Sequence, residues 1–354
     1  MRIVIDLDGT ICSLCKSDGY AGVKPNPGAA DAIKELRAAG HDVIISTARH
    51  MKTCDGDRKL VVAKIGQLTI DWLKEHDIQY DEIHFGKQYA NAYIDDLAIP
   101  FNGWEELDPK YFDEKVFNVV IPMAGYGSRF SKADYKEPKP MIDVNGRPMF
   151  QWAVESLQLE NIPHRLFFIV LEEVEHKYGL SKAIKALYPT ARIVTIKNVT
   201  RGQAETVLAV RKFINNLNKL IIFNCDTISE SNLRQKVEED DPDGIIATFN
   251  SSSPSYSYAK LNEAGYVTDV AEKEVISSHA STGLYYFKRG RDYVAAAEKM
   301  IEDGKCVNNE FYIMPVYEYL IRAGKRIQIE TATNYEVLGT PADLDRFKSK
   351  KTLE

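Results

Sequence analysis

No apolar run in this sequence is as long as a membrane-spanning helix requires, and its first residues lack the successive charged, apolar and small-residue regions of a signal peptide. We therefore expect a cytoplasmic protein with no membrane partner. Cysteine is also scarce. The five cysteines are scattered and odd in number, and Cys12 and Cys15 have no second pair that would complete a zinc site. The sequence therefore predicts free thiols.

Long basic runs are missing too, and the net charge is −6, which argues against nucleic acid as the main partner. Anionic substrates must then be bound by local positive groups. What is present is the composition of an ordinary globular protein, 44% hydrophobic and 27% charged. Since 354 residues exceed what one hydrophobic core usually organises, we expect two domains, and a homo-oligomer stays open.

Apolar strand-like runs alternate with helical patterns along the chain, which is typical of an α/β fold with parallel sheets. In the first part the pattern predicts strands at 2–6, 42–47 and 92–95 and helices at 28–39 and 59–75. Turn formers and charges interrupt it near 101–115. We predict domains over residues 1–105 and 117–354, joined by a linker over 106–116.

The second part repeats the alternation over a longer stretch. The pattern predicts strands at 116–123, 165–171, 192–196 and 220–225, and helices at 149–158, 203–215 and 291–302. No internal repeat or low-complexity tract is present. We therefore expect a separate α/β domain of roughly twice the size.

Two carboxylates, Asp6 and Asp8, directly follow the first predicted strand, at the edge where open α/β sheets bind ligands. One carboxylate can attack phosphorus while the other, protonated, gives its proton to the leaving oxygen. A phosphate dianion repels such a nucleophile unless a cation offsets the charge, so Mg²⁺ is required. Asp95 and Asp96, at the end of a later predicted strand, can supply further oxygen ligands.

Two more residues complete this set. Thr47 ends a predicted strand and offers a hydroxyl to a phosphate oxygen, and Lys87 offers a positive charge ahead of Asp95. Together these residues resemble the four motifs of the HAD phosphatase superfamily, and the segments MRIVIDLDGTIC and ISTAR are similar to those of small capsule-biosynthesis phosphatases. The resemblance implies a small capless HAD-like Rossmannoid domain, with Asp6 as nucleophile, Asp8 as acid/base, and Asp6, Asp8 and Asp95 as Mg²⁺ ligands.

Some assignments in this part stay open. The DLDGT segment alone also fits a strand-to-helix turn in which an aspartate caps the next helix. Ser46 can take the place of Thr47, and Asp96 either binds metal or orients Asp95. No cap domain fits before residue 100, so we expect an open active site.

A second constellation begins with the apolar strand that precedes Ala124, Gly125, Gly127, Ser128 and Arg129. Glycines let backbone N–H groups approach a phosphate chain closely, and Arg129 can offset the charge of a pyrophosphate leaving group. Ten residues after Arg129, Lys139 between two prolines supplies a second cation.

The order AGYGSRF and EPKPMIDVNGRPMF resembles the signature of the sugar-nucleotide pyrophosphorylase family, over nearly all of residues 117–345. The resemblance implies a Rossmann-like, GT-A-type nucleotidyltransferase domain whose glycine loop binds a nucleoside triphosphate (NTP) and whose Lys139 contacts phosphates. It also implies that Gln203 contacts the base, that Asp226 binds Mg²⁺, and that Glu272 and Lys273 bind the sugar phosphate. Glu310 resembles a second acidic position of the phosphocholine-cytidylyltransferase branch.

This domain needs no protein nucleophile, because the phosphate of the substrate itself attacks the α-phosphorus of the NTP. The protein aligns two anions and offsets their charge with Mg²⁺, Arg129, Lys139 and Lys273. We favour CTP because the segment around Glu310 and the compact domain look most like cytidylyltransferases.

We expect the acceptor to be a phosphorylated sugar, polyol or amino alcohol, for capsule or surface polysaccharide precursors. Three alternatives remain for this domain. Asp226 can cap a helix and Glu310 can begin one. A catalytically silent scaffold would keep the fold, although both sites retain their charged residues. A glycosyltransferase would share the nucleotide-sugar fold, but Asn224 stands where a D-x-D metal motif needs its first acid.

Overall fold

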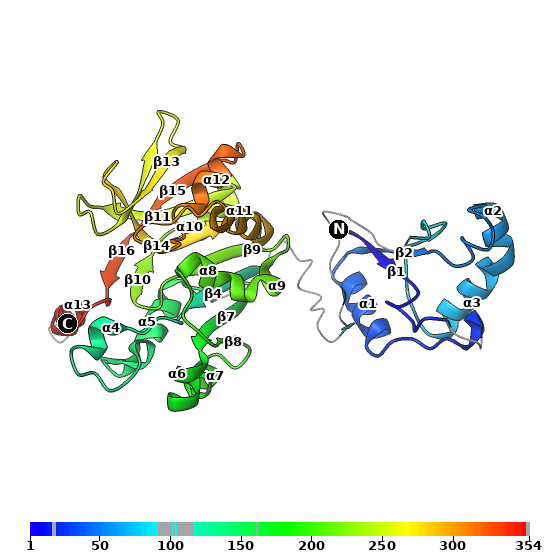
Figure 1. Ribbon diagram of the computed structural model, residues 1–354, viewed down its shortest axis with the longest axis horizontal. Helices are drawn as coiled ribbons and strands as arrows, with labels where there is room; N and C mark the ends of the chain where they lie inside the picture. Colours follow the sequence, from blue (N-terminus) through cyan, green and yellow to red (C-terminus); the bar gives the residue numbers. More distant parts are fainter. Residues whose placement is uncertain (16–18, 91–100, 102, 105–115, 161, 352–354) are drawn as a thin grey trace. The chain divides into compact units, whose positions relative to one another are not determined.

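The computed structural model describes residues 1–15, 19–90, 101, 103–104, 116–160 and 162–351. The chain divides into two compact units, Met1–Asp113 and Glu114–Glu354, which we describe separately (Figure 1). Within the described residues, no helix is long and apolar enough to cross a membrane. The predicted strand at 92–95 and residues 106–115 of the predicted linker lie outside the described residues.

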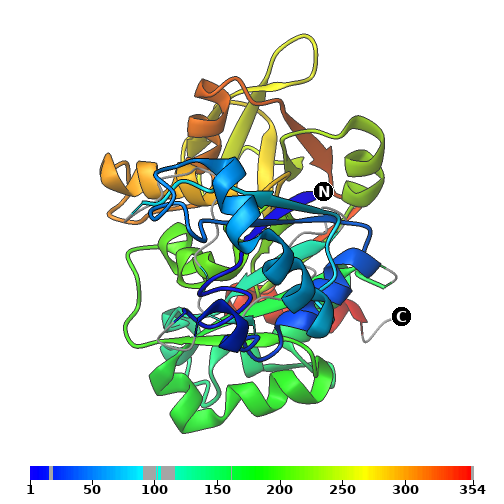
Figure 2. The ribbon, with the colours of Figure 1, turned by 90° about the vertical axis from the view of Figure 1, so that its right-hand side faces the viewer.

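The N-terminal unit contains a parallel sheet in the order β1-β2-β3, formed in the described residues by β1 (Arg2–Asp6), β2 (Asp42–Thr47) and β3 (Glu82–Phe85). Its helical segments, drawn in shades of blue in Figure 2, are η1 (Tyr20–Gly22), α1 (Ala29–Ala38), α2 (Arg58–Val61), η2 (Val62–Gly66) and α3 (Gln67–Glu75). Asp6 pairs in register with Ser46, and Thr47 with Phe85. The carboxyl ends of the three strands therefore meet at one edge of the sheet.

Burial and capping explain these elements. Alternate strand residues such as Ile5, Val43 and Ile45 pack with Ile33 of α1 and Trp72 of α3 in one core. The carboxylate of Asp57 accepts hydrogen bonds from the N–H groups of the first turn of α2, at 2.9 and 3.2 Å, and so begins that helix.

The C-terminal unit is built on a larger mixed sheet, which in the described residues runs β13-β12-β14-β9-β4-β7-β8, with β11 paired to β14 and β15 paired to β11. Its parallel centre consists of β4 (Phe117–Pro122), β7 (His164–Leu171), β8 (Arg192–Ile196) and β9 (Lys219–Phe223). The parallel strands agree with the predicted α/β fold, and the sheet is mixed because β14 (His279–Phe287) runs antiparallel to both β9 and β11 (Gly244–Asn250). The remaining sheet strands are β12 (Ser257–Leu261), β13 (Val267–Glu272) and β15 (Ile327–Thr331).

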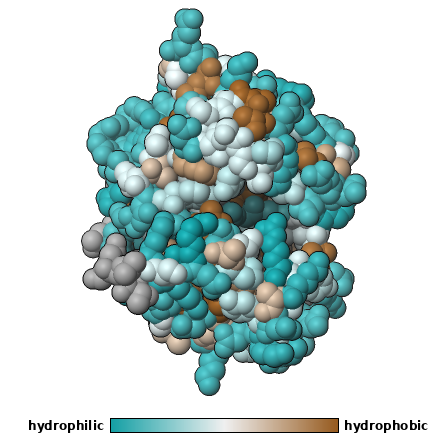
Figure 3. Space-filling model, turned by 90° about the vertical axis from the view of Figure 1, so that its left-hand side faces the viewer, coloured by the Kyte–Doolittle hydropathy of each residue, from teal (hydrophilic) through white to brown (hydrophobic). Residues whose placement is uncertain are grey.

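Short strands and helices surround this sheet. The strands are β5 (Asp143–Val144), β6 (Arg147–Pro148), β10 (Thr227–Glu230) and β16 (Asn334–Val337). The helical segments before β9 are α4 (Ser128–Ser131), η5 (Lys139–Met141), α5 (Met149–Ser156), α6 (Glu172–Tyr178), α7 (Leu180–Leu187), α8 (Gln203–Val207), η6 (Leu208–Val210) and α9 (Arg211–Ile214). Those after it are α10 (Leu233–Asp240), α11 (Gly290–Glu302), α12 (Val316–Arg322) and α13 (Pro341–Lys351). Figure 3 shows the face of this unit that lies on the left in Figure 1, with a mainly hydrophilic surface hollowed across its middle.

The two faces of this sheet carry separate cores. Val120 of β4 belongs to a cluster that includes side chains of α8, α11 and α12, whereas Val119 and Ile121 belong to a second cluster with α5, α7 and α10. Strand side chains alternate between faces, so these apolar runs are buried on both sides, as in a helix-covered parallel sheet.

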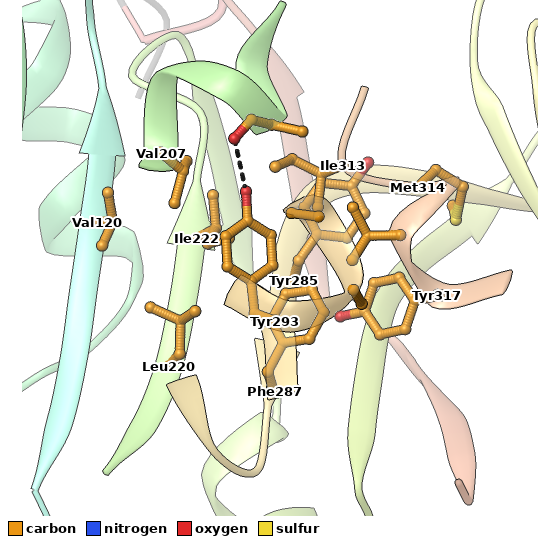
Figure 4. Close-up of a cluster of buried hydrophobic side chains, with 14 of the residues drawn as sticks. Val120, Val207, Leu220, Ile222, Tyr285, Phe287, Tyr293, Ile313, Met314 and Tyr317 are labelled. Carbon is orange, nitrogen blue, oxygen red and sulfur yellow. Dashed lines mark hydrogen bonds between the residues drawn. The ribbon is translucent and has the colours of Figure 1, made fainter. Parts of the chain in front are cut away.

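One hydrogen bond in the core fixes the position of α8. Tyr293 of α11 is fully buried, and its hydroxyl donates a hydrogen bond of 3.0 Å to the carbonyl oxygen of Ala204 in α8 (Figure 4). A buried hydroxyl without a partner would cost roughly 1–3 kcal/mol. This bond therefore ties the first turn of α8, directly after Gln203, to the core.

Candidate functional site

The glycine-rich loop of the C-terminal unit follows β4, at the carboxyl edge of the parallel strands. Gly127 has φ +58° and precedes α4. A Cβ atom at Gly127 would lie 2.9 Å from the Cβ of Lys139. The glycine therefore lets the chain at Lys139 pass directly against the loop.

Lys139 forms an ion pair with Asp226, which follows β9. The two side chains are 21% and 19% exposed, so the pair is mostly removed from water. Burial acts to raise the pKa of Asp226, but the Lys139 ammonium outweighs it and holds that pKa below its usual value. Burial likewise acts to lower the pKa of Lys139, and the Asp226 carboxylate reverses this and raises it. The alternative role of Asp226 as a helix cap is wrong, because β10 follows it.

A second segment is held beside this pair by backbone contact. Gly202 has φ +146°, and a Cβ there would lie 2.4 Å from the backbone nitrogen of Phe311. Hydrogen bonds of 2.8 and 2.9 Å join Phe311 to Arg201 and Ala204. Only glycine permits this approach, which places Gln203 close to the segment that contains Glu310.

Asn224 orients Gln203 from the sheet side. The Nε2 of Gln203 donates a hydrogen bond of 2.7 Å to Oδ1 of Asn224. The Asn224 amide lies against Gly283, where a Cβ would be 2.2 Å from its Nδ2. In the sequence Asn224 is marked only as the residue that stands in place of the first acid of a D-x-D motif, and the pattern does not predict this contact.

These groups line one pocket of about 580 Å³. It contains seven of the predicted site residues, namely Ala124, Gly125, Gly127, Lys139, Gln203, Asp226 and Glu310. It also contains Asn224 and Tyr312, which were not predicted. Ser128, Arg129 and Lys273 are not among its lining residues. The positive charge of Arg129 nevertheless acts on both Lys139 and Tyr312, so its side chain lies near the pocket.

Glu272 and Lys273 lie beside Tyr312. The Glu272 side chain is only 2% exposed and accepts a hydrogen bond from the Ser257 hydroxyl. Burial raises the pKa of Glu272, and the negative charge of Glu310 adds to this effect. Lys273 has φ +61°, its Nζ donates 2.5 Å to the carbonyl oxygen of Ser255, and it lies 5.6 Å from the Tyr312 ring centroid.

The donor set can be compared with the needs of Mg²⁺, which prefers carboxylate and carbonyl oxygens. Asp226 and Glu310 both face the pocket, but among the described residues no three acidic, histidine or cysteine side chains are grouped so that they could hold a metal ion. Mg²⁺ usually takes one or two carboxylates plus substrate phosphates, so two acids are a sufficient set. Glu310 does not begin a helix, because α12 starts at Val316.

The predicted residues of the N-terminal unit also converge. Oδ2 of Asp6 lies 2.7 Å from Nζ of Lys87, and its Oδ1 accepts a 2.9 Å hydrogen bond from the N–H of Leu7. The Thr47 hydroxyl lies 3.4 Å from Oδ2 of Asp8. Asp95 and Asp96 lie outside the described residues, so the metal set here stays a prediction.

Sequence reasoning missed Arg49 in this site. Its side chain is fully buried and forms an ion pair of 2.8 Å with Asp8. The signal was available in the sequence, since Arg49 follows Thr47 by two residues in the ISTAR segment. The nearby Cys12 is buried, which raises its pKa to about 12 and fits a thiol that stays protonated.

Comparison with known proteins decides the family of the larger unit. A family model described as nucleotidyl transferase matches residues 118–333, more than half of the chain. The chain belongs to the nucleotidyl transferase family. A second model, described as haloacid dehalogenase-like hydrolase, matches residues 3–61, which include Asp6, Asp8, Thr47 and Arg49 but not Lys87.

Individual relatives agree with this family. A nucleoside-diphosphate-sugar pyrophosphorylase structure from Vibrio cholerae RC9 is 30% identical, with a TM-score of 0.58, and the match covers 65% of this chain and 99% of that one. An inositol-1-phosphate CTP transferase from T. maritima shares the fold at 16% identity, with a TM-score of 0.54 and coverage of 67% and 96%. The bifunctional protein GlmU of Thermodesulfovibrio yellowstonii is 24% identical over 229 residues, 60% of this chain. The chain spans about half of that protein, 46% of its length.

Proposed function

We propose that this nucleotidyl transferase family member is a bifunctional enzyme. Its C-terminal unit transfers NMP from an NTP to a phosphorylated sugar, polyol or amino alcohol and releases pyrophosphate. Its N-terminal unit hydrolyses phosphomonoesters through an aspartyl-phosphate. The observation that carries the transferase proposal is the pocket in which the glycine loop, the Lys139–Asp226 pair and Gln203 meet at the carboxyl ends of β4 and β9.

The residues in and near the C-terminal pocket have distinct tasks. The backbone N–H groups at Gly125 and Gly127 approach the phosphates, and Lys139 and Arg129 offset their charge. Gln203 contacts the base, and Lys273 binds the acceptor phosphate, whose oxygen attacks the α-phosphorus in line as the bond to pyrophosphate breaks. Asp226 and Glu310 would hold Mg²⁺, which supplies charge stabilisation on the phosphates.

CTP is the favoured nucleotide, as the segment around Glu310 suggests. The names of similar proteins include a CTP transferase for inositol 1-phosphate and a sugar pyrophosphorylase, which supports a small phosphorylated acceptor without deciding the base. We place the enzyme in the cytoplasm, in the synthesis of capsule or surface polysaccharide precursors, with no nucleic-acid or membrane partner.

A separate observation favours the second activity, namely that Asp6, Lys87, Asp8 and Thr47 lie together at one sheet edge. In the first step an Asp6 oxygen bonds to phosphorus as the bond to the leaving oxygen breaks, and Asp8 gives that oxygen a proton. In the second, water attacks phosphorus, Asp8 accepts a water proton, and inorganic phosphate leaves Asp6. Asp6, Asp8 and Asp95 would hold Mg²⁺, which offsets the charge of the phosphate.

The test of the transferase is a pyrophosphate-release screen with Mg²⁺, each NTP, and a panel of sugar, polyol and amino-alcohol phosphates. We expect activity with CTP that is lost in Asp226→Ala and kept in Asp6→Asn, which alters only the N-terminal site. If no combination of NTP and acceptor released pyrophosphate, the result would favour a catalytically silent scaffold. Transfer of sugar from a nucleotide sugar, without pyrophosphate release, would instead indicate a glycosyltransferase.

The test of the phosphatase is phosphate release from p-nitrophenyl phosphate and from the same phosphorylated panel. We expect Asp6→Asn to abolish this activity and Asp226→Ala to leave it unchanged. The two variants are matched controls, because each alters one unit of the same chain. A wild-type protein that releases no phosphate from any of these compounds would refute the second activity.

A further inference from the structure

Arg49 is the one residue of the N-terminal site, among those that the structure describes, whose side chain is fully buried and carries a permanent charge. Burying a guanidinium is costly unless it is paired and hydrogen-bonded. Its place beside a predicted catalytic carboxylate therefore calls for an explanation.

The contact with Asp8 has a forked geometry. Nε of Arg49 lies 3.0 Å from both carboxylate oxygens, and its second terminal nitrogen lies 2.8 Å from Oδ1. An arginine fork fixes the plane as well as the position of a carboxylate, which a lysine ammonium does not. Asp8 is thereby aligned with the Thr47 hydroxyl on its other side.

The guanidinium itself is held from several directions. The Tyr20 ring lies 4.6 Å from its central carbon, the Thr69 hydroxyl 3.4 Å from one terminal nitrogen, and the Cys12 sulfur 3.4 Å from the other. Thr69 in turn donates 2.9 Å to the carbonyl oxygen of Ile65. Among the residues that the structure describes, Asp8 is the carboxylate that pairs with this guanidinium, so the packed core sets the orientation of Asp8.

The fork bears on the second of the two tasks proposed for Asp8. Arginine only donates hydrogen bonds, so both oxygens of Asp8 act as acceptors in this arrangement. This is the ionised form of Asp8 that remains after the first step has given its proton to the leaving oxygen, and the second step needs it to take a proton from water. We propose that Arg49 is a positioning residue that holds Asp8 as the base for hydrolysis of the aspartyl-phosphate. This inference rests on the proposed phosphatase function.

The test is pre-steady-state hydrolysis of p-nitrophenyl phosphate with Mg²⁺ by the full chain, because p-nitrophenolate leaves without a proton. In Arg49→Met, we expect a burst of about one equivalent of nitrophenol per site, followed by turnover roughly 100-fold slower than wild type. Arg49→Lys should recover only part of the turnover, since it keeps the charge but not the fork. Asp8→Asn should give the same burst, and adding Arg49→Met to it should slow turnover no further.

The double variant, Asp8→Asn with Arg49→Met, also controls for misfolding, because it removes both opposite charges of the buried pair and leaves neither unpaired. Equal loss of burst rate and turnover in Arg49→Met, with its unfolding temperature unchanged, would overturn the inference. So would additive losses in the double variant. A wild-type chain that forms no phosphoenzyme and no nitrophenol would overturn the proposed phosphatase, and the inference with it, so the two failures are distinguishable.

Discussion

The Lys139–Asp226 pair in the C-terminal pocket should make a large contribution to stability, in contrast to a surface ion pair. Its side chains are about four-fifths buried, at 21% and 19% exposure. Removing one partner of a buried pair costs about 3–5 kcal/mol because the other charge is left unpaired. The remaining exposure reduces this, and we expect Lys139→Met to lower the free energy of unfolding by about 2–3 kcal/mol.

The assay is calorimetric unfolding of the full chain, in which the transition of the C-terminal unit should fall by roughly 4–12 °C. Asp226→Asn combined with Lys139→Met should recover most of the loss, because the pair is then removed as a unit. The matched control is Lys299→Met, whose exposed pairs with Glu302 and Asp303 should leave the transition unchanged.

The pH dependence gives a second check on the same pair. The pKa of Asp226 is lowered in the folded state, so its contribution is present above the ordinary value of 3.8 and is lost as the pH falls through the folded pKa. Asp226→Asn should therefore reduce the difference in stability between neutral and acidic solution. A Lys139→Met protein as stable as wild type at neutral pH would refute the reasoning.

Three further outcomes are expected in the same unit. Gly202→Ala should raise the KM for the NTP at least about tenfold, because its Cβ would strike the backbone of Phe311; phosphatase activity serves as the control. Asn224→Leu should reduce the discrimination between NTPs, measured as ratios of kcat/KM. Asn224→Asp is the control, because it keeps an oxygen that accepts the hydrogen bond of Gln203; equal kcat/KM ratios in the two variants would contradict the proposed orientation of Gln203. Glu272→Gln should gain stability relative to wild type as the pH rises above about 4.5, because burial raises the Glu272 pKa, and urea titrations at acidic and neutral pH would measure it.

Strands and helices with sharp boundaries were predictable from the sequence. The apolar run at 42–47, bounded by polar residues, coincides with β2, and the run at 192–196 coincides with β8. β3 (Glu82–Phe85) was missed because it is only four residues long, although its side chains alternate between polar and apolar. The single helix predicted at 203–215 is divided among α8, η6 and α9, a local tightening that periodicity does not reveal.

The residues of the candidate sites also fall into those that the sequence predicts and those that it does not. Residues at strand ends or between glycines, such as Asp6 and Asp226, were predictable because strand register and loop chemistry fix their places. Arg49 and Asn224 were missed. Arg49 stands in the ISTAR segment, but its partner Asp8 is 41 residues away, and Gln203, the partner of Asn224, is 21 residues away. Such contacts depend on the packing of the core, which a single sequence does not state.

The backbone contact of Gly202 with Phe311 joins residues 201–204 and 310–312 into one structural unit. A shift of one segment would break the hydrogen bonds between them unless the other moved with it, and the Tyr293 hydroxyl holds Ala204 to the core. A designer who wishes to change the nucleotide preference would therefore have to transplant both segments together from a donor enzyme. If residues 201–204 alone were exchanged, their new backbone would no longer fit against residues 310–312.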